Sequence, residues 1–283
     1  MILDAHHHLW DLSRGYAWLD DDDLAAIRRD FGVSDLLVNL TAAGVDRTVL
    51  VEGGRCDATE VREFLAIADA TEQILGVVGW ADVADPALAD VLAAHRVAPG
   101  GRWLVGVRAQ VQHEPEPDYL ARVDVHRGLA TVADAGLTFD LVVRGDQLAG
   151  AATAVNAVPQ AMFVLDHLGY PPILDGPSGL PAWRERLAPL AAAPNVVAKL
   201  SGLVTVADRR RWTVDDLRPW VRAAVELFGP GRLMFGSDWP VCLLAASYPR
   251  VKNALDEALG DMGRKEREAI FSGTAIATYG LDA

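Results

Sequence analysis

Eight short apolar runs recur along the chain, separated by longer stretches with the spacing of amphipathic helices. The runs are Ile2–Ala5, Thr48–Val51, Leu75–Trp80, Leu104–Val107, Leu137–Val142, Met162–Leu165, Val196–Leu200 and Leu233–Gly236. Strands that alternate with helices form parallel sheets, and eight such units close into a barrel. The length of 283 residues is near the ~250 residues usual for that barrel. We therefore predict an α/β protein with one domain, residues 1–283, folded as a (β/α)8 TIM-like barrel.

Ala- and Leu-rich stretches between these runs have the period of helices that cover a sheet. They are Thr59–Ala70, Pro86–Ala94, Val123–Ala135, Gln147–Val155, Pro181–Ala191, Val214–Phe228, Tyr248–Leu259 and Lys265–Tyr279. Thr213, followed three residues later by Asp216, resembles a capping box and predicts the start of one helix. The longest excursion between strands, at about residues 9–46, is either a lid over the active site or a peripheral cap.

Polar residues follow nearly every predicted strand. They are His6, His7, His8, Glu52, Trp80, Asp82, Arg108, Arg144, Asp166, His167, Lys199, Ser201, Ser237, Asp238 and Trp239. In a parallel barrel the carboxyl ends of all strands meet on one face, and active sites form on that face. We therefore expect most of these side chains to gather around one pocket.

The overall composition excludes several classes of function. A net charge of -13 leaves no basic surface for nucleic acid, and the short run Arg209–Arg211, bordered by Asp208, is interpreted as a solvated helix edge. Two distant cysteines, Cys56 and Cys242, indicate a reducing compartment and no disulfide framework. The sequence shows no signal peptide and no apolar span of membrane length, so we expect a soluble, cytoplasmic protein without membrane partners. A homo-oligomer stays open.

His6 and His8 are the first candidates for chemistry. Side chains alternate along an extended backbone, so both imidazoles point to the same side of the first strand. Two neutral imidazoles in this arrangement can hold one divalent metal ion. His7 points the other way and is interpreted as structural.

His167 and Asp238 complete the predicted cluster, because they follow the sixth and eighth strands. A carboxylate at the end of the last strand can act as general base toward a water molecule, bind a metal ion, or both. A structural histidine and a turn aspartate are the alternatives for each residue taken alone. Four residues of this chemistry at the ends of three strands favour one active site.

The remaining candidates concern substrate binding. Arg108 and Lys199 are cations that either hold a substrate group or neutralise buried carboxylates. Glu52 is either a metal ligand or a support for one. The aromatic residues Trp10, Tyr16, Trp18, Trp80 and Trp239 are candidates for an apolar wall, with ordinary packing as the alternative.

Six motifs in order along the chain carry a resemblance to a known family. They are Asp4-Ala5-His6-His7-His8-Leu9-Trp10, Tyr16-Ala17-Trp18-Leu19, Gly106-Val107-Arg108, Leu165-Asp166-His167-Leu168-Gly169, Lys199-Leu200-Ser201-Gly202-Leu203 and Phe235-Gly236-Ser237-Asp238-Trp239-Pro240. The chain resembles the sugar-acid lactonases of the amidohydrolase superfamily, which are L-fuconolactonase-like and L-rhamnonolactonase-like and are related to 2-pyrone-4,6-dicarboxylate lactonase. This resemblance spans the whole chain and is less specific for the substrate.

The resemblance implies hydrolysis of a small-molecule lactone, a sugar-acid 1,4- or 1,5-lactone, to its hydroxy acid. Asp238 would activate the attacking water, and Arg108 would contact the substrate. His6, His8 and His167 would bind one divalent ion, zinc or manganese, or would polarise the carbonyl without metal. The loop Val51–Cys56 departs from the family pattern, which leaves its substrate contacts open. Few pocket arginines argue against a dicarboxylate substrate, although Arg55 and Arg144 keep it open.

Two other functions remain as alternatives at this stage. A metal-dependent decarboxylase of the same superfamily carries the same kinds of residues and would release CO2. A non-catalytic sugar-acid binding protein would use the aromatic wall alone, and it does not require the Asp/His cluster.

Overall fold

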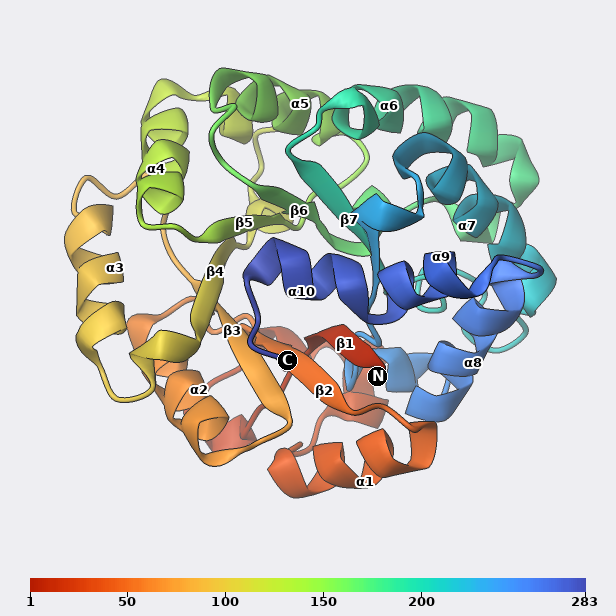
Figure 1. The fold of residues 1–283 in the computed structure, drawn as a ribbon, viewed down its shortest axis with the longest axis horizontal. Coiled ribbons are helices and arrows are strands. Elements are labelled where there is room, and N and C mark those ends of the chain that lie inside the picture. Colours follow the sequence, from red (N-terminus) through yellow and green to blue (C-terminus); the bar gives the residue numbers. More distant parts are fainter.

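The computed structural model describes all 283 residues and contains eight parallel strands paired in sequence order. They are β1 (Leu3–His7), β2 (Arg47–Val51), β3 (Ile74–Trp80), β4 (Leu104–Ala109), β5 (Thr138–Leu141), β6 (Phe163–Leu165), β7 (Val196–Leu200) and β8 (Leu233–Phe235). Figure 1 shows the helices forming a ring outside the strands. Nearly every strand residue is buried, which explains why the strands are continuous apolar runs in the sequence. The predicted TIM barrel is confirmed.

Ten α-helices connect or follow the strands. They are α1 (Val33–Ala43), α2 (Ala58–Ala70), α3 (Leu88–Val97), α4 (Val123–Asp134), α5 (Leu148–Ala157), α6 (Leu180–Ala192), α7 (Val214–Phe228), α8 (Tyr248–Leu259), α9 (Arg264–Glu268) and α10 (Thr274–Tyr279). The Thr213–Asp216 capping box begins α7 as predicted. Two features differ from the expectation: α1 lies within the excursion, and a π-helical turn at Ala269–Gly273 divides the last predicted helix.

The barrel closes where β8 meets β1. Asp238 N donates to His6 O at 2.8 Å, and His8 N donates to Trp239 O at 2.7 Å. The buried carboxylate of Asp4 also joins the two strands, because it accepts hydrogen bonds from Ser237 N at 2.8 Å and Tyr248 Oη at 2.6 Å. This seam brings His6 and His8 next to Asp238, although some 230 residues separate them along the chain.

A separate apolar cluster fills the interior at the amino ends of the strands. It comprises Leu3, Ala5, Val49, Val51, Leu75, Val78, Val164, Val197, Met234, Ala275, Tyr279 and Leu281. The last three belong to α10 and the C-terminal residues, and Figure 1 shows α10 crossing this end of the barrel. The helix thus closes the barrel at the end opposite the predicted site.

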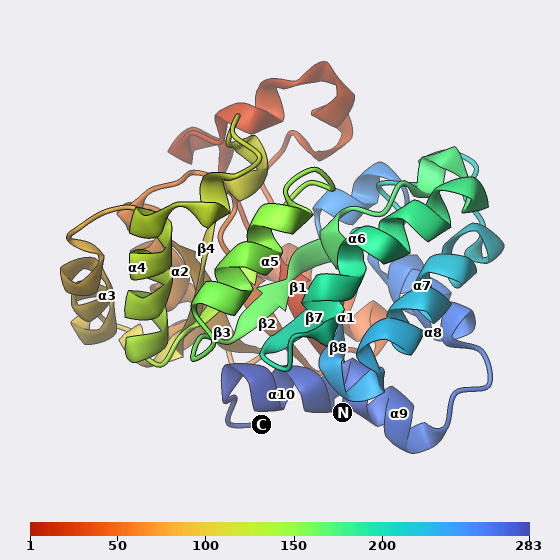
Figure 2. The ribbon, with the colours of Figure 1, turned by 90° about the horizontal axis from the view of Figure 1, so that it is seen from above.

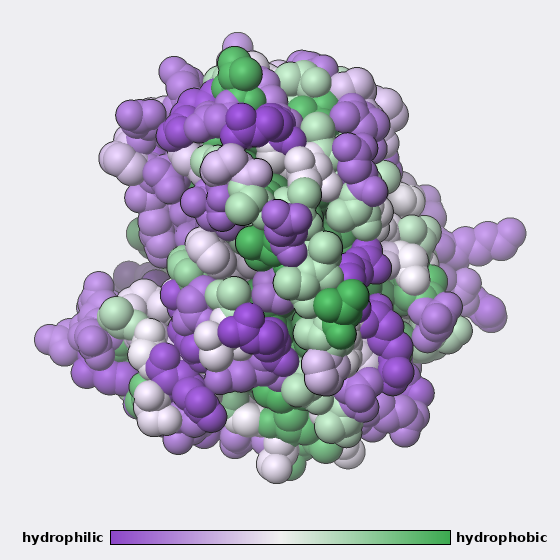
Figure 3. Space-filling model, turned by 90° about the vertical axis from the view of Figure 1, so that its left-hand side faces the viewer, coloured by the Kyte–Doolittle hydropathy of each residue, from purple (hydrophilic) through white to green (hydrophobic).

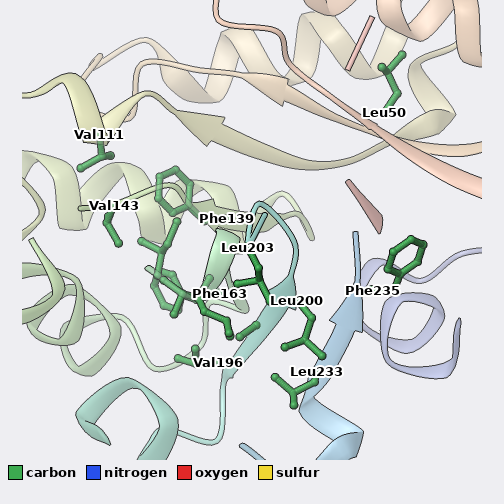
Figure 4. Packing of buried hydrophobic residues seen from close by; sticks show 14 of the residues in the cluster. Leu50, Val111, Phe139, Val143, Phe163, Val196, Leu200, Leu203, Leu233 and Phe235 are labelled. Atoms are coloured by element: carbon green, nitrogen blue, oxygen red, sulfur yellow. The ribbon is translucent and has the colours of Figure 1, made fainter. Parts of the chain in front are cut away.

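The larger core lies between the strands and the surrounding helices. Figure 4 shows part of it, with Phe139, Phe163, Leu200 and Leu233 among the packed side chains. The rings of Phe139 and Phe163 meet edge to face, with centroids 6.4 Å apart. Burying a side chain of this size contributes roughly 1.5–3 kcal/mol, so this layer supplies a large share of the favourable free energy of folding.

The first part of the excursion, residues 9–32, lies at the carboxyl ends of the strands, and α1 lies in the outer ring of helices beside α8. The excursion contains three 3-10 helices, Leu12–Arg14, Ala17–Asp20 and Asp22–Ile27, followed by α1. Trp10 and Phe31 pair their backbones across it, with Trp10 N donating to Phe31 O at 3.1 Å. Figure 2 shows the part of the excursion before α1 on the opposite side of the barrel from α10 and the chain termini.

The outer surface is mostly hydrophilic, with hydrophobic side chains interspersed among charged ones on the face drawn in Figure 3. This distribution agrees with the 23% of charged residues in the sequence. None of the helices combines the length and the apolar character needed to cross a lipid bilayer.

Candidate active site

A pocket of about 460 Å³ opens at the carboxyl ends of the strands. His8, Arg108, His167 and Asp238 line it, and they come from the ends of β1, β4, β6 and β8. His6 lies directly beneath, fully buried. The structure therefore brings together the four residues of the predicted cluster at the face where barrel active sites form.

His6, His8 and Asp238 form a compact triangle of potential ligand atoms. His6 Nε2 lies 3.2 Å from His8 Nε2, and Asp238 Oδ1 lies 3.7 Å from the first and 3.5 Å from the second. His8 Nδ1 is 3.0 Å from Val51 O, so Nδ1 carries the proton and Nε2 presents a lone pair. The triangle thus offers a carboxylate oxygen and at least one unprotonated imidazole nitrogen to a common point.

Two glycines make room for the histidine rings. A Cβ at Gly236 would lie 2.7 Å from His6 Cβ, and a Cβ at Gly202 would lie 2.7 Å from His167 Nδ1. Gly202 also has a φ of +66°, which disfavours any larger residue. These positions explain why small residues accompany the polar ones at the ends of β7 and β8.

His167 belongs to a second group, with His6 and Asp166, rather than to the triangle. Its Nδ1 lies 2.9 Å from Ser201 Oγ, and its ring centroid lies 4.6 Å from that of His6. The predicted set of four therefore consists of two overlapping groups that share His6. Burial lowers the pKa of both His6 and His167, so both imidazoles are neutral near pH 7.

The backbone is strained at several residues in or beside the pocket wall, Tyr170 with a φ of 54° among them. Asp238 has a φ of 57° and His167 a φ of 53°, both in the left-handed region. Leu168 has a φ of 53°, which is costly for a residue with its side chain. Strain of this kind persists where the surrounding structure fixes it, and it concentrates at functional sites.

Arg108 lies on the pocket wall, but neighbouring acids occupy most of its guanidinium. Nε donates to Glu52 Oε1 at 2.6 Å, one terminal nitrogen to Glu52 O and the other to Asp166 Oδ2, both at 2.9 Å. Burial opposes the charge of Arg108, yet Glu52 and Asp166 raise its pKa above the usual value. Glu52 is outside the triangle of potential metal ligands, because both of its oxygens are engaged by Arg108, Gln110 and Gly54.

Lys199 lies below the pocket, where it is fully buried and does not line the wall. Its Nζ lies 2.6 Å from Asp140 Oδ2, 3.0 Å from Asp166 Oδ1 and 3.1 Å from His6 Nδ1. This placement contradicts the predicted substrate contact and supports the alternative, neutralisation of buried acids. Burial alone would raise the pKa of Asp166, but the charges of Lys199 and Arg108 hold it well below its usual value.

Of the aromatic residues predicted to contact substrate, Trp18 alone lines the pocket. Trp10, Tyr16 and Trp239 are buried in the packing of the excursion against β8, where Phe31 contacts both tryptophans edge to face. The prediction was wrong for these three residues, because strand and loop periodicity does not indicate how deeply an aromatic ring is covered. Trp80 likewise lies outside the pocket wall.

Several pocket residues escaped the sequence analysis as site residues. They are Gln110, Gln112, His113, Tyr170 and Arg209, on loops beyond strand ends. Arg209 was interpreted as part of a solvated helix edge, yet it lines the pocket. Asp166 was expected near the pocket because it follows the sixth strand, and it lies there as the partner of His6, Arg108 and Lys199.

Comparison with known proteins identifies the family. The sequence profile described as amidohydrolase matches residues 3–281, and the chain therefore belongs to this family of hydrolases. The superfamily predicted from the sequence motifs is confirmed.

Two curated relatives are similar over nearly their whole length. The L-fucono-1,5-lactonase of Burkholderia multivorans is 36% identical over 99% of this chain and 96% of its own. The L-fucono-1,5-lactonase of Burkholderia ambifaria is 33% identical over the same shares of the two chains. Among solved structures, a zinc-bound amidohydrolase from Burkholderia multivorans superposes with a TM-score of 0.92 and 34% identity, covering 99% of both chains.

Proposed function

We propose that this protein hydrolyses a sugar-acid lactone to the open-chain hydroxy acid. The observation that carries the proposal is Asp238, a carboxylate on the pocket wall whose Oδ1 lies within 3.7 Å of two imidazole nitrogens. The similarity to two L-fucono-1,5-lactonases supports the choice of a cyclic ester. The size of the lactone ring, 1,4 or 1,5, is part of what the experiment must determine.

The triangle of His6, His8 and Asp238 fits a divalent metal ion. Donor atoms about 2.0–2.2 Å from a tetrahedral zinc lie roughly 3.3–3.6 Å apart, close to the 3.2, 3.5 and 3.7 Å separations found here. The lone pair on His8 Nε2 also favours a cation over a hydrogen bond to a carbonyl oxygen. Zinc or manganese bound by these residues would supply Lewis-acid polarisation of the carbonyl.

In the proposed reaction, Asp238 orients a water molecule and accepts its proton as the water oxygen attacks the lactone carbonyl carbon. The negative charge that develops on the carbonyl oxygen is stabilised by the cationic and polar groups facing the pocket, His167 and Arg108 among them. The bond from the acyl carbon to the ring oxygen then breaks, and protonated Asp238 returns its proton to that oxygen. The new carboxylic acid ionises, so each turnover releases one proton.

Proton release measured with a pH indicator tests this function on a panel of 1,4- and 1,5-sugar lactones. A general base typically contributes about 10²–10⁴-fold to the rate, so we expect Asp238→Asn to lose most of the activity. The far-UV circular dichroism of that variant should match the wild type. Full activity in Asp238→Asn would refute the assignment of the base.

The same assay separates the alternatives. A decarboxylase acting on an aromatic or muconate-type acid would release CO2, and a binding protein would show saturable binding of sugar acids without turnover. Hydrolysis of at least one lactone with stoichiometric proton release excludes both.

A further inference from the structure

A chain of hydrogen bonds runs along the pocket wall formed by the loops after β4 and β6. Tyr170 Oη donates to Gln112 Oε1 at 2.8 Å, and Gln112 Nε2 donates to Gln110 Oε1 at 3.0 Å. Gln110 Nε2 donates in turn to Glu52 Oε1, which also accepts from Arg108 Nε. Because the Glu52 carboxylate paired with Arg108 only accepts, Gln110 must turn its NH2 toward it. This orientation fixes every donor and acceptor further along the chain.

The two fixed amides retain hydrogen-bonding capacity on the pocket side. Gln110, Gln112 and Tyr170 all line the pocket and are half-buried. An amide has two N–H donors and an oxygen with two lone pairs. The hydrogen-bond chain uses one N–H donor and one oxygen lone pair of each glutamine. One N–H donor and one lone pair of each glutamine therefore remain for a ligand. A hydroxyl group both donates and accepts, and it is therefore the natural complement of such a wall.

Most of the apolar residues of the pocket wall come from its other side, which also carries His8, Asp238 and Arg209. Val206 follows β7, Val241 and Leu244 follow β8, and Trp18 and Leu24 lie in the excursion after β1. Because the strands follow one another around the barrel in sequence order, β4 to β6 lie across from β8 and β1. The pocket therefore presents the hydrogen-bonded chain on one side, and on the other side an apolar patch beside the candidate catalytic groups.

The chemistry of ring opening does not require this polar chain, since Asp238 and the histidines carry it. We propose that Gln110, Gln112 and Tyr170 determine specificity, by selecting lactones that bear hydroxyl groups on the ring or its side chain. The C–H face or methyl end of the same substrate packs against Trp18 and the apolar side. This inference rests on the proposed lactonase function, and the substrate feature that the site recognises is the set of hydroxyl groups on the lactone.

The test compares two lactones with the same five-membered ring. L-Fucono-1,4-lactone carries hydroxyl groups, and γ-butyrolactone carries none. We expect Gln112→Leu to lower kcat/KM for the hydroxylated lactone by about 10- to 100-fold, because unpaired polar groups at a site built for hydrogen bonds are costly. The value for γ-butyrolactone should change by less than about threefold, since one lost contact to water has little effect. Tyr170→Phe removes one donor and should show a smaller loss in the same direction.

Gln160→Leu is the matched control, because Gln160 is exposed on the loop before β6, at the other end of the barrel. It should leave both substrates unchanged. An equal loss on both lactones in Gln112→Leu would overturn the inference and assign the chain a structural role. A wild-type enzyme that does not prefer the hydroxylated lactone would also overturn it. If the wild type opens no lactone at all, the proposed function itself fails. That result is seen with the wild type alone and is therefore distinct from a failure of the inference.

Discussion

The two ends of the barrel are built on different principles. At the carboxyl ends of the strands, polar and charged groups are buried together, and the backbone of Asp238 and His167 is held in the left-handed region. At the amino ends, an apolar cluster fills the interior and α10 covers it. Stability and reactivity are therefore separated along the barrel axis, and the carboxyl end can bear strain because the amino end is well packed.

A layer of buried charge separates these two ends. Lys199 contacts Asp140 and Asp166, and Tyr279 Oη from α10 donates to Asp140 Oδ2 at 2.7 Å. Lys199 thus lies between the apolar cluster at the amino ends and His6, and its Nζ is 3.1 Å from His6 Nδ1. A buried cation surrounded by acids is tolerated because each charge has partners.

A change at the amino end of the barrel should affect stability and leave catalysis almost unchanged. Met234→Ala removes a fully buried side chain from the lower interior, and the lost burial and remaining cavity should lower the free energy of unfolding by about 2–5 kcal/mol. We expect kcat/KM per folded molecule to stay within about threefold, since no pocket residue changes. Urea unfolding and lactone kinetics measure the two effects.

Met262→Ala is the control for this change, because Met262 is only half-buried against the outer helices. Its cost in unfolding free energy should be clearly smaller. A loss of activity in Met234→Ala as large as its loss of stability would show that the two ends are not separable.

Two adjacent histidines at the end of β1 have different roles. His8 belongs to the triangle, whereas His7 lies beside it and contacts Thr48 Oγ1 at 3.0 Å, away from the pocket. Burial lowers the pKa of His7 to about 3, so it is neutral and structural at working pH. We expect His8→Ala to lose bound zinc and to lower kcat/KM by about 10²–10³-fold.

His7→Ala should instead lower the free energy of unfolding by about 1–3 kcal/mol, because Thr48 loses a buried partner. It should retain zinc and most of the activity per folded molecule. Metal analysis, kinetics and urea unfolding of both variants measure these differences. Equal zinc content in the two variants would contradict the role of His8 as a metal ligand.

A smaller effect concerns Glu60, whose ionisation makes the free energy of unfolding depend on pH. Burial, with the neighbouring charge of Glu52, raises the pKa of Glu60 from its ordinary value of 4.5 to about 8. The folded state therefore holds this proton more tightly than the unfolded chain, and the stability it contributes is lost as pH rises from about 4.5 through 8. Glu60→Gln should be more stable than the wild type at pH 9, by roughly 1–2 kcal/mol, with a smaller difference at pH 5.

Thermal or urea unfolding at the two pH values measures this difference. Glu185→Gln, at an exposed position on α6, is the control and should not change the pH dependence. A wild type that loses no stability relative to Glu60→Gln between pH 5 and pH 9 would show that Glu60 is charged throughout.

The fold was predictable because its signal is repeated eight times. Each strand is buried on both faces and is therefore a short apolar run, and the helices between them keep one apolar side. Helix α1 was missed because it lies in the long excursion, where no neighbouring strand marks its place. The π-helical turn before α10 likewise leaves no mark in the hydrophobic period.

The meeting of the four candidate residues at one end of the barrel was predictable for the same topological reason. Parallel strands place His6, His8, His167 and Asp238 at one end, whatever the side chains do locally. Depth was not predictable: Lys199 was chosen as a pocket residue because it lies near the end of β7, yet it lies below the pocket, in contact with Asp140. Loop residues such as Gln112 and Tyr170 gave no signal, because their direction depends on tertiary contacts alone.

Isotope labelling tests the proposed attack of water on the lactone carbonyl most directly. The oxygen of solvent water is followed through a single turnover in H2 18O. If a water activated by Asp238 attacks the carbonyl, one label enters the carboxylate of the hydroxy acid and none enters the hydroxyl released from the ring. The same labelling should proceed about 10²–10⁴-fold more slowly in Asp238→Asn. Label in the released hydroxyl, or an unchanged rate in the variant, would contradict the proposed role of this site.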